Sequence, residues 1–202
     1  MNSDIVDLRS FYSSLIGRLA ERAIAMALSP IWADLPNERL VGLGYALPWL
    51  DRFGGDAERV FAFMPGTQGA VSWPPGGPSA TAMVFDEELP LPDSAIDRIL
   101  LVHLLEHSEN PRETLKEAWR VLAPGGRVVM TMINPLLGDI GHAIWWYSED
   151  KQRGGMLPGE VGGMWTRDIV ALCAAVGLRL ETHRRFVYGM NHLYVFVDAA
   201  TN

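Results

Sequence analysis

The stretch LPLPDSAIDRILLVHLLEH (residues 89–107), continued by NPRETLKEAWRVLAPGGRVVMTMI (residues 110–133), decides the fold. Its apolar runs at Asp97–His103 and Arg127–Ile133 are nearly continuous, as in strands that are covered on both faces of a sheet. Because a helix-like segment separates them, we expect the two strands to be parallel neighbours in an α/β sheet.

The connecting segment Asn110–Leu122 predicts a helix. Asn110 is a candidate N-cap and Pro111 stands at the first helical position, where its missing N–H is not needed. Ala123–Gly126 then forms the turn into the next strand, since its two glycines give the backbone the required freedom. The expected inner stripe consists of Leu115, Ala118, Trp119 and Leu122.

Short apolar runs on either side extend this pattern to about seven strands. Three precede it, at Arg39–Leu43, Ala57–Phe63 and Ala80–Phe85. A helix at Thr166–Val176 and two strands at Leu178–His183 and His192–Val197 follow it. The sequence therefore predicts a doubly wound, mostly parallel Rossmann-like sheet with an antiparallel C-terminal hairpin.

The N-terminal segment, Ser3 to about Leu28, repeats apolar residues at helical spacing and predicts one amphipathic helix. Ser29–Pro30 should end it, because the residue before a proline is pushed out of helical geometry. This helix either covers one face of the core or forms a lid over a ligand site.

Two segments lack a clear period. Pro65–Ser79 is a Pro/Gly-rich loop where a crossover helix would be normal, and residues 134–164 are expected to form a long loop or partial lid. Neither repeats nor a linker divide the chain, so we expect residues 1–202 to form a single domain with residues 1–30 as an extra N-terminal helix.

Composition excludes several classes of protein. A net charge of −7 argues against a nucleic-acid partner, which needs a clustered positive face. One cysteine, Cys173, excludes a disulfide scaffold and a cysteine-based zinc cluster, and no histidine spacing predicts another metal site. The chain has no apolar run of the roughly 18–20 residues that span a membrane and no secretory signal, so we expect a cytoplasmic protein.

The deciding stretch resembles the class I S-adenosylmethionine-dependent methyltransferases, in their small-molecule branch. LPLPDSAIDRI (residues 89–99) is similar to the family's LPFPDxSFDxV, and VHLLEH (residues 102–107) to its VLEH strand end. LKEAWRVLAPGGR (residues 115–127) follows its EhxRVLKPGGxh pattern. The resemblance implies S-adenosylmethionine as cofactor, bound beyond the carboxyl ends of the strands.

The first cofactor motif of that family, DxGxGxG, is altered in GLGYALP (residues 42–48). Gly42 stands where the acid should be and Gly44 matches the first glycine, while Ala46 and Pro48 replace the other two. The resemblance still implies that Gly42, Gly44, Tyr45 and Ala46 surround the cofactor. Tyr45 is bulkier than the small residue usual there, and it could fill part of the space.

The resemblance implies further cofactor contacts at the ends of the next strands. Met64 replaces the acid whose oxygens accept both ribose hydroxyls, which predicts weak affinity. Asp86, with its neighbour Glu87, is expected beside the adenine amino group, although both could equally form a solvated acidic turn. His103 and Leu104 are expected to wall the site.

Acceptor binding is harder to place. His107 could act as a general base near neutral pH, or it could be a turn or helix-cap histidine. Four residues in an irregular segment could wall a substrate pocket, fill the core or cover a homo-oligomer interface. They are His142, Trp145, Trp146 and Tyr147.

Two functions remain open: a methyltransferase acting on a small molecule, and a non-catalytic binding or regulatory module with a degenerate cofactor site. A nicotinamide enzyme is disfavoured, because no GxGxxG follows the first strand. The two readings predict different structures. An open cavity from Gly44 to Asp86 supports the enzyme, and closure of that space by Tyr45, Met64 or Trp73 supports the module.

Overall fold

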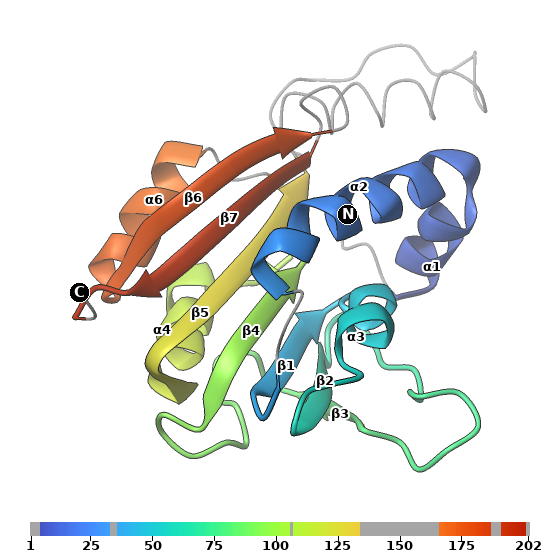
Figure 1. Cartoon of the computed structure of the whole chain (residues 1–202), viewed down its shortest axis with the longest axis horizontal. Helices are drawn as coiled ribbons and strands as arrows, with labels where there is room; N and C mark the ends of the chain where they lie inside the picture. Colours follow the sequence, from blue (N-terminus) through green and yellow to red (C-terminus); the bar gives the residue numbers. More distant parts are fainter. Residues whose placement is uncertain (1–4, 33–35, 106, 134–165, 187–190, 201–202) are drawn as a thin grey trace.

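The computed structural model describes residues 5–32, 36–105, 107–133, 166–186 and 191–200. Its centre is one seven-stranded sheet in the order β3-β2-β1-β4-β5-β7-β6, in which β7 runs antiparallel to β5 and β6 and the other pairs are parallel (Figure 1). The strands are β1 (Arg39–Gly44), β2 (Arg59–Pro65), β3 (Thr81–Val84), β4 (Ile96–Val102), β5 (Leu122–Ile133), β6 (Leu178–Phe186) and β7 (Asn191–Asp198). The predicted fold class is confirmed, as is the expectation that β4 and β5 are parallel neighbours.

Helices cover both faces of the sheet (Figure 1). They are α1 (Ile5–Ser13), α2 (Leu15–Trp32), α3 (Leu47–Phe53), α4 (Pro111–Val121) and α6 (Thr166–Ala175). On β4, Ile99 and Leu101 pack with α4 and α6, whereas Leu100 and Val102 pack with α1, α2 and α3. This double burial explains the nearly continuous apolar run of β4. None of the described helices has the length and hydropathy of a membrane span.

The turn into β5 is an irregular part of that strand. Ile96 pairs with Leu122 and Arg98 with Arg127, so residues 123–126 loop out against a single residue of β4. Gly125 has a φ of 79°, in the left-handed region that favours glycine. The predicted turn therefore exists, although β5 begins before it.

Helix α4 differs from its prediction in two details. Trp119 is not part of the inner stripe: it is 42% exposed and lies against Gly177, while Thr114 is buried in its place. The side chain of Asn110 does not cap the helix, because its Nδ2 donates to Glu87 Oε1 at 2.8 Å. The backbone carbonyl of Asn110 accepts the first helical hydrogen bonds instead.

The N-terminal region forms two helices rather than one. The chain turns back so sharply at Ser14 that a Cβ on Gly17 would lie 1.9 Å from the carbonyl oxygen of Phe11. Ser14 Oγ accepts the N–H of Gly17 at 3.0 Å and caps the second helix. That helix also continues through Pro30, because burial of Trp32 against Phe53 holds its last turn.

The connection from β2 to β3 contains no helix in residues 66–80, as predicted. Strand β2 lies two residues later than expected, since Met64 and Pro65 are buried and pair with β3. The segment 134–164, predicted as a loop or partial lid, lies outside the described residues.

Candidate functional site

The candidate site lies at the carboxyl edge of the sheet, where β1 and β4 are neighbours. Strand order runs outward through β2 and β3 on one side and through β5 on the other, so the switch point falls between β1 and β4. Open α/β sheets bind ligands at such a point, because the following loops diverge there. The residues that follow these strands therefore form the site.

The turn after β1 is tightly packed. Gly44 has a φ of 77°, and a Cβ there would lie 2.4 Å from the carbonyl oxygen of Val102. The N–H of Tyr45 donates to that same oxygen at 2.9 Å, and the N–H of Ala46 donates to the carbonyl of Gly44 at 3.0 Å. These amides are thus used inside the chain and do not face an open space.

Gly42 is crowded by the helix that follows it. A Cβ at Gly42 would lie 2.6 Å from Ala46 Cβ and 2.7 Å from Leu50 Cδ1. At these distances a neighbour must shift, and Ala46 Cβ has no flexible side chain that could give way, so an acidic side chain at this position requires α3 to move. The missing acid follows from close packing of α3 on β1.

Tyr12, on α1, covers the turn after β1. Its ring stacks on Tyr45 at 5.1 Å between centroids and meets Trp49 edge-on at 5.5 Å. Its hydroxyl forms a hydrogen bond of 2.6 Å with His103 Nε2. Tyr12 is buried, and burial also raises the pKa of the Tyr45 phenol. In the sequence Tyr12 is only one apolar position of the N-terminal helical pattern, and no local signal marks this role.

His103 is the centre of a buried polar cluster. Its backbone has a φ of 50°, and its carbonyl accepts Gln68 Nε2 at 2.8 Å. The carbonyl of Gln68 in turn accepts the N–H of Ile5, so the loop after β2 ties α1 to the end of β4. Gln68 Oε1 and Thr131 Oγ1 are buried without a hydrogen-bond partner among the described residues. Each such group costs about 1–3 kcal/mol.

Met64, at the end of β2, is closed off from solvent. Its side chain is fully buried and its Sδ accepts the N–H of Val71 at 3.3 Å. Trp73 lies further along the same loop, is also buried, and donates from Nε1 to Asp51 Oδ1 at 2.6 Å. The loop 66–80 therefore closes over β2. A thioether that already accepts a backbone amide offers no charged acceptor for ribose hydroxyls.

Asp86 and Glu87 connect β3 to the start of α4. Asp86 Oδ2 accepts Ser108 Oγ at 3.0 Å and Thr114 Oγ1 at 2.7 Å. Glu87 Oε1 accepts the side chain of Asn110. These carboxylates hold two segments together, so they are more than a solvated turn.

Two further predicted site residues, Leu104 and His107, follow β4. Leu104 is buried in the core under α4 and α6, although its Cβ lies 3.4 Å from the Cβ that Gly44 would carry. His107 lies half-buried in the turn before α4, where its N–H donates to the carbonyl of Leu104. The four residues predicted for the acceptor pocket, His142, Trp145, Trp146 and Tyr147, lie outside the described residues.

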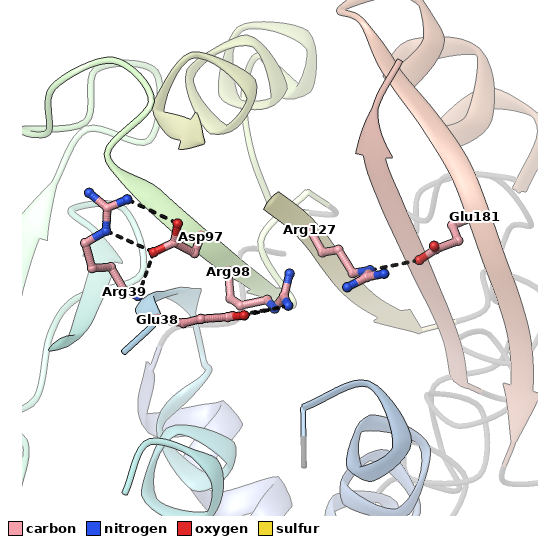
Figure 2. Close-up of polar contacts among 6 residues, drawn as sticks. All are labelled: Glu38, Arg39, Asp97, Arg98, Arg127 and Glu181. Atoms are coloured by element: carbon pink, nitrogen blue, oxygen red, sulfur yellow. Dashed lines mark hydrogen bonds and ion pairs between the residues drawn. The ribbon is translucent and has the colours of Figure 1, made fainter. Parts of the chain in front are cut away.

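The opposite, amino edge of the sheet carries an ion-pair network (Figure 2). Arg39 donates from Nε and Nη2 to the two oxygens of Asp97 and holds the pKa of that carboxyl below its usual value. Arg98 pairs with Glu38 at 2.8 Å. A polar hollow of about 470 Å³ lies at this edge, lined by Asn37, Glu38, Arg39, Glu58, Asp97, Arg98, Pro124, Gly125 and Gly126. Its arginines and acids are largely paired with one another, which indicates a role in joining strands.

S-adenosylmethionine does not fit the carboxyl edge in this closed arrangement. The amides after β1 are engaged, Met64 is sealed, and Tyr12 stands against the glycine turn. Closure comes largely from α1 and the loop 66–80, which lie outside the sheet. Among the described residues, no group of three or more His, Cys, Asp or Glu side chains could hold a metal ion.

Comparisons with known proteins agree with this architecture. Residues 75–130 match the family described as "Methyltransferase domain". An uncharacterised protein of Methanocaldococcus jannaschii is 36% identical over 69 residues, which cover 33% of this chain and only 31% of that protein.

Two solved structures extend the likeness to the whole fold. A SAM-dependent methyltransferase from Aquifex aeolicus has a TM-score of 0.61 at 14% identity, covering 88% of this chain and 91% of its own. The [4+2]-cyclase SpnF has a TM-score of 0.60 at 16% identity, covering 86% of this chain and 62% of its own. Residues 75–130 thus resemble a methyltransferase domain, and the described residues share the fold of S-adenosylmethionine-dependent methyltransferases.

Proposed function

We propose that the chain is an S-adenosylmethionine-dependent methyltransferase with a small-molecule acceptor. One observation carries the proposal: the stretch that matches the methyltransferase domain includes β4 and β5, which form one side of the switch point between β1 and β4. The cofactor would lie across this edge, between the turn at Gly44–Ala46 and Asp86. A small acceptor is consistent with the net charge of −7, which disfavours a nucleic-acid substrate.

Binding should be weak. A charged acceptor for the ribose is missing at Met64, and its loss costs about 1.5–3 kcal/mol, or roughly one to two orders of magnitude in affinity. Calorimetry with S-adenosylhomocysteine, the product form of the cofactor, tests the proposal without knowledge of the acceptor. We expect saturable binding with a dissociation constant well above the nanomolar range.

Asp86 provides a check on the location of that binding. Asp86→Asn keeps an oxygen for Ser108 and Thr114 but removes the negative charge, so it should weaken binding of S-adenosylhomocysteine. Asp93→Asn is the matched control, since Asp93 is an exposed acid paired with Arg120. Equal affinities in both variants would place any binding elsewhere.

The second candidate is a non-catalytic module, and the closed carboxyl edge favours it. Tyr45, Met64 and Trp73 are all buried, which is the arrangement expected for a site that no longer admits the cofactor. The fold alone does not decide, because one fold hosts many chemistries. Nanomolar binding would show that another group replaces the missing ribose acceptor. If neither the wild type nor folded variants of the covering residue Tyr12 bind S-adenosylhomocysteine, the chain is a non-catalytic module.

A further inference from the structure

We infer that α1 is a hinged cover of the carboxyl edge, held shut by Tyr12, and that it must open before the cofactor can enter. This inference rests on the proposed function and concerns how that same site is controlled. Its first support is competition for space: the Tyr12 ring lies flat on Tyr45, directly after the glycine turn. A ligand that uses this turn and the ring of Tyr12 cannot both occupy the position.

The cover is held to the sheet by polar contacts at its two ends. The Tyr12 hydroxyl joins His103 Nε2 at 2.6 Å, after β4. At the other end of α1, the N–H of Ile5 donates to the carbonyl of Gln68 at 2.8 Å, and the side chain of Gln68 holds the carbonyl of His103. Both ends of the helix therefore depend on the same residue, His103 directly after β4, so release at His103 would loosen the whole cover.

Helix α1 is built as a separate piece. It has nine residues, too few to be stable alone in water, so packing against the sheet keeps it in place. Its outer face is open to solvent, with Val6 65% and Phe11 40% exposed. The chain breaks at Ser14 before α2 begins, which provides a hinge.

Near the contact between Tyr12 and His103, two buried side-chain oxygens lack hydrogen-bond partners among the described residues. Gln68 Oε1 and Thr131 Oγ1 have no hydrogen-bond partner in the described part of the chain, although Gln68 is 3% and Thr131 1% exposed. Thr131 is the residue whose carbonyl accepts the N–H of His103. Buried polar groups normally find partners, so unpaired ones beside the Tyr12–His103 contact indicate that a polar ligand completes this site when the cover is open.

The test compares S-adenosylhomocysteine binding by the full chain and three variants. Tyr12→Phe removes the hydroxyl contact with His103 but keeps the ring, and the loss of one net hydrogen bond predicts binding tighter by about three- to tenfold. Tyr12→Ala removes the ring as well and should bind at least as tightly as Tyr12→Phe. Val6→Ala is the matched control, an exposed position of the same helix, and should bind like the wild type.

Amide hydrogen exchange on the wild type gives a second measurement that does not depend on the variants folding. Ligand should raise exchange in α1 if the helix opens. Tighter binding by Tyr12→Phe together with faster exchange supports the cover. Weaker binding by both Tyr12 variants, or slower exchange in α1, overturns it and makes Tyr12 part of the cofactor site, while the proposed function stands. If neither the wild type nor any folded variant binds S-adenosylhomocysteine, both the proposed function and the cover are overturned.

Discussion

Asp97→Asn should destabilise the sheet by an amount that depends on pH. Asp97 Oδ2 accepts the backbone N–H and the Nε of Arg39, both at 2.9 Å, and Oδ1 accepts Nη2 at 3.1 Å. The amide of asparagine keeps one accepting oxygen but turns an NH₂ group toward the guanidinium. Because one hydrogen bond is lost and the others are no longer assisted by a negative charge, the free energy of unfolding should fall by about 1.5–3 kcal/mol. Because the Arg39 side chain is 37% exposed, solvent screening moves the expectation to the lower half of that range.

The pH dependence follows from the hydrogen bonds of Arg39, which lower the pKa of Asp97 in the folded state. Such a carboxylate stabilises the fold above its unfolded pKa of about 3.9, and this stabilisation is lost as pH falls through the range from the unfolded to the folded pKa. At neutral pH the free energy of unfolding of the wild type should therefore exceed that of Asp97→Asn by the full amount, about 1.5–3 kcal/mol. The difference should shrink below about pH 4.

Urea denaturation at neutral and acidic pH measures both quantities. Asp93→Asn is the control, because Asp93 contacts Arg120 at 2.7 Å but is 79% exposed, and exposed ion pairs contribute little. Glu117, whose pKa Arg120 also lowers, keeps some acid sensitivity in every variant. Equal losses from the two substitutions, or a loss from Asp97→Asn that persists undiminished in acid, would refute the reasoning.

Two further predictions concern the turn after β1 and the free thiol. Gly44→Ala should lower the free energy of unfolding by more than about 2 kcal/mol, because the residue has a left-handed φ and its new Cβ would meet the carbonyl oxygen of Val102. Gly55→Ala is the control, since its Cβ would meet nothing within 4 Å; similar unfolding midpoints would contradict the prediction. Burial raises the pKa of Cys173 to about 12, so a disulfide reagent should modify it only after unfolding, and rapid labelling of the native protein would contradict this.

The parts of the fold that the sequence predicted are those encoded by neighbours along the chain. The β4–α4–β5 unit has all its signals within 38 residues counted from Ile96 to Ile133: two apolar runs, a helix start at Pro111 and a glycine turn. Its location in the sheet follows from the handedness and packing of such units. The parallel pairing of β4 and β5 could therefore be predicted before any contact was known.

The errors arose where distant contacts decide local structure. The break at Ser14 depends on how α2 folds back over α1, and the orientation of Trp119 depends on Gly177. Thr114 turns inward because its hydroxyl reaches Asp86, 28 residues earlier in the chain. Local propensity describes none of these contacts, and tertiary packing overrides it.

The sequence was enough to predict where the candidate site lies, but not that Tyr12 closes it. Met64 and Tyr45 were correctly placed at the ends of β2 and β1, because strand ends follow from the apolar runs. Tyr12, which closes the site, lies 91 residues from its partner His103. A tyrosine in an apolar helical stripe is the only local signal, and it does not identify the partner of the hydroxyl.

The departures in the first glycine motif have a common physical origin. Helix α3 begins at Leu47, with Pro48 in its first turn, and packs so closely that Ala46 and Leu50 occupy the space beside Gly42. An acid at Gly42 would require α3 to move away from β1, and the covering stack of Tyr12 on Tyr45 would have to move with it. The absent acid, the early helix and the aromatic cover are thus parts of one packing arrangement. A single reversion within the motif therefore cannot recreate an open glycine turn, because α3 and the aromatic residues that cover it would have to move as well.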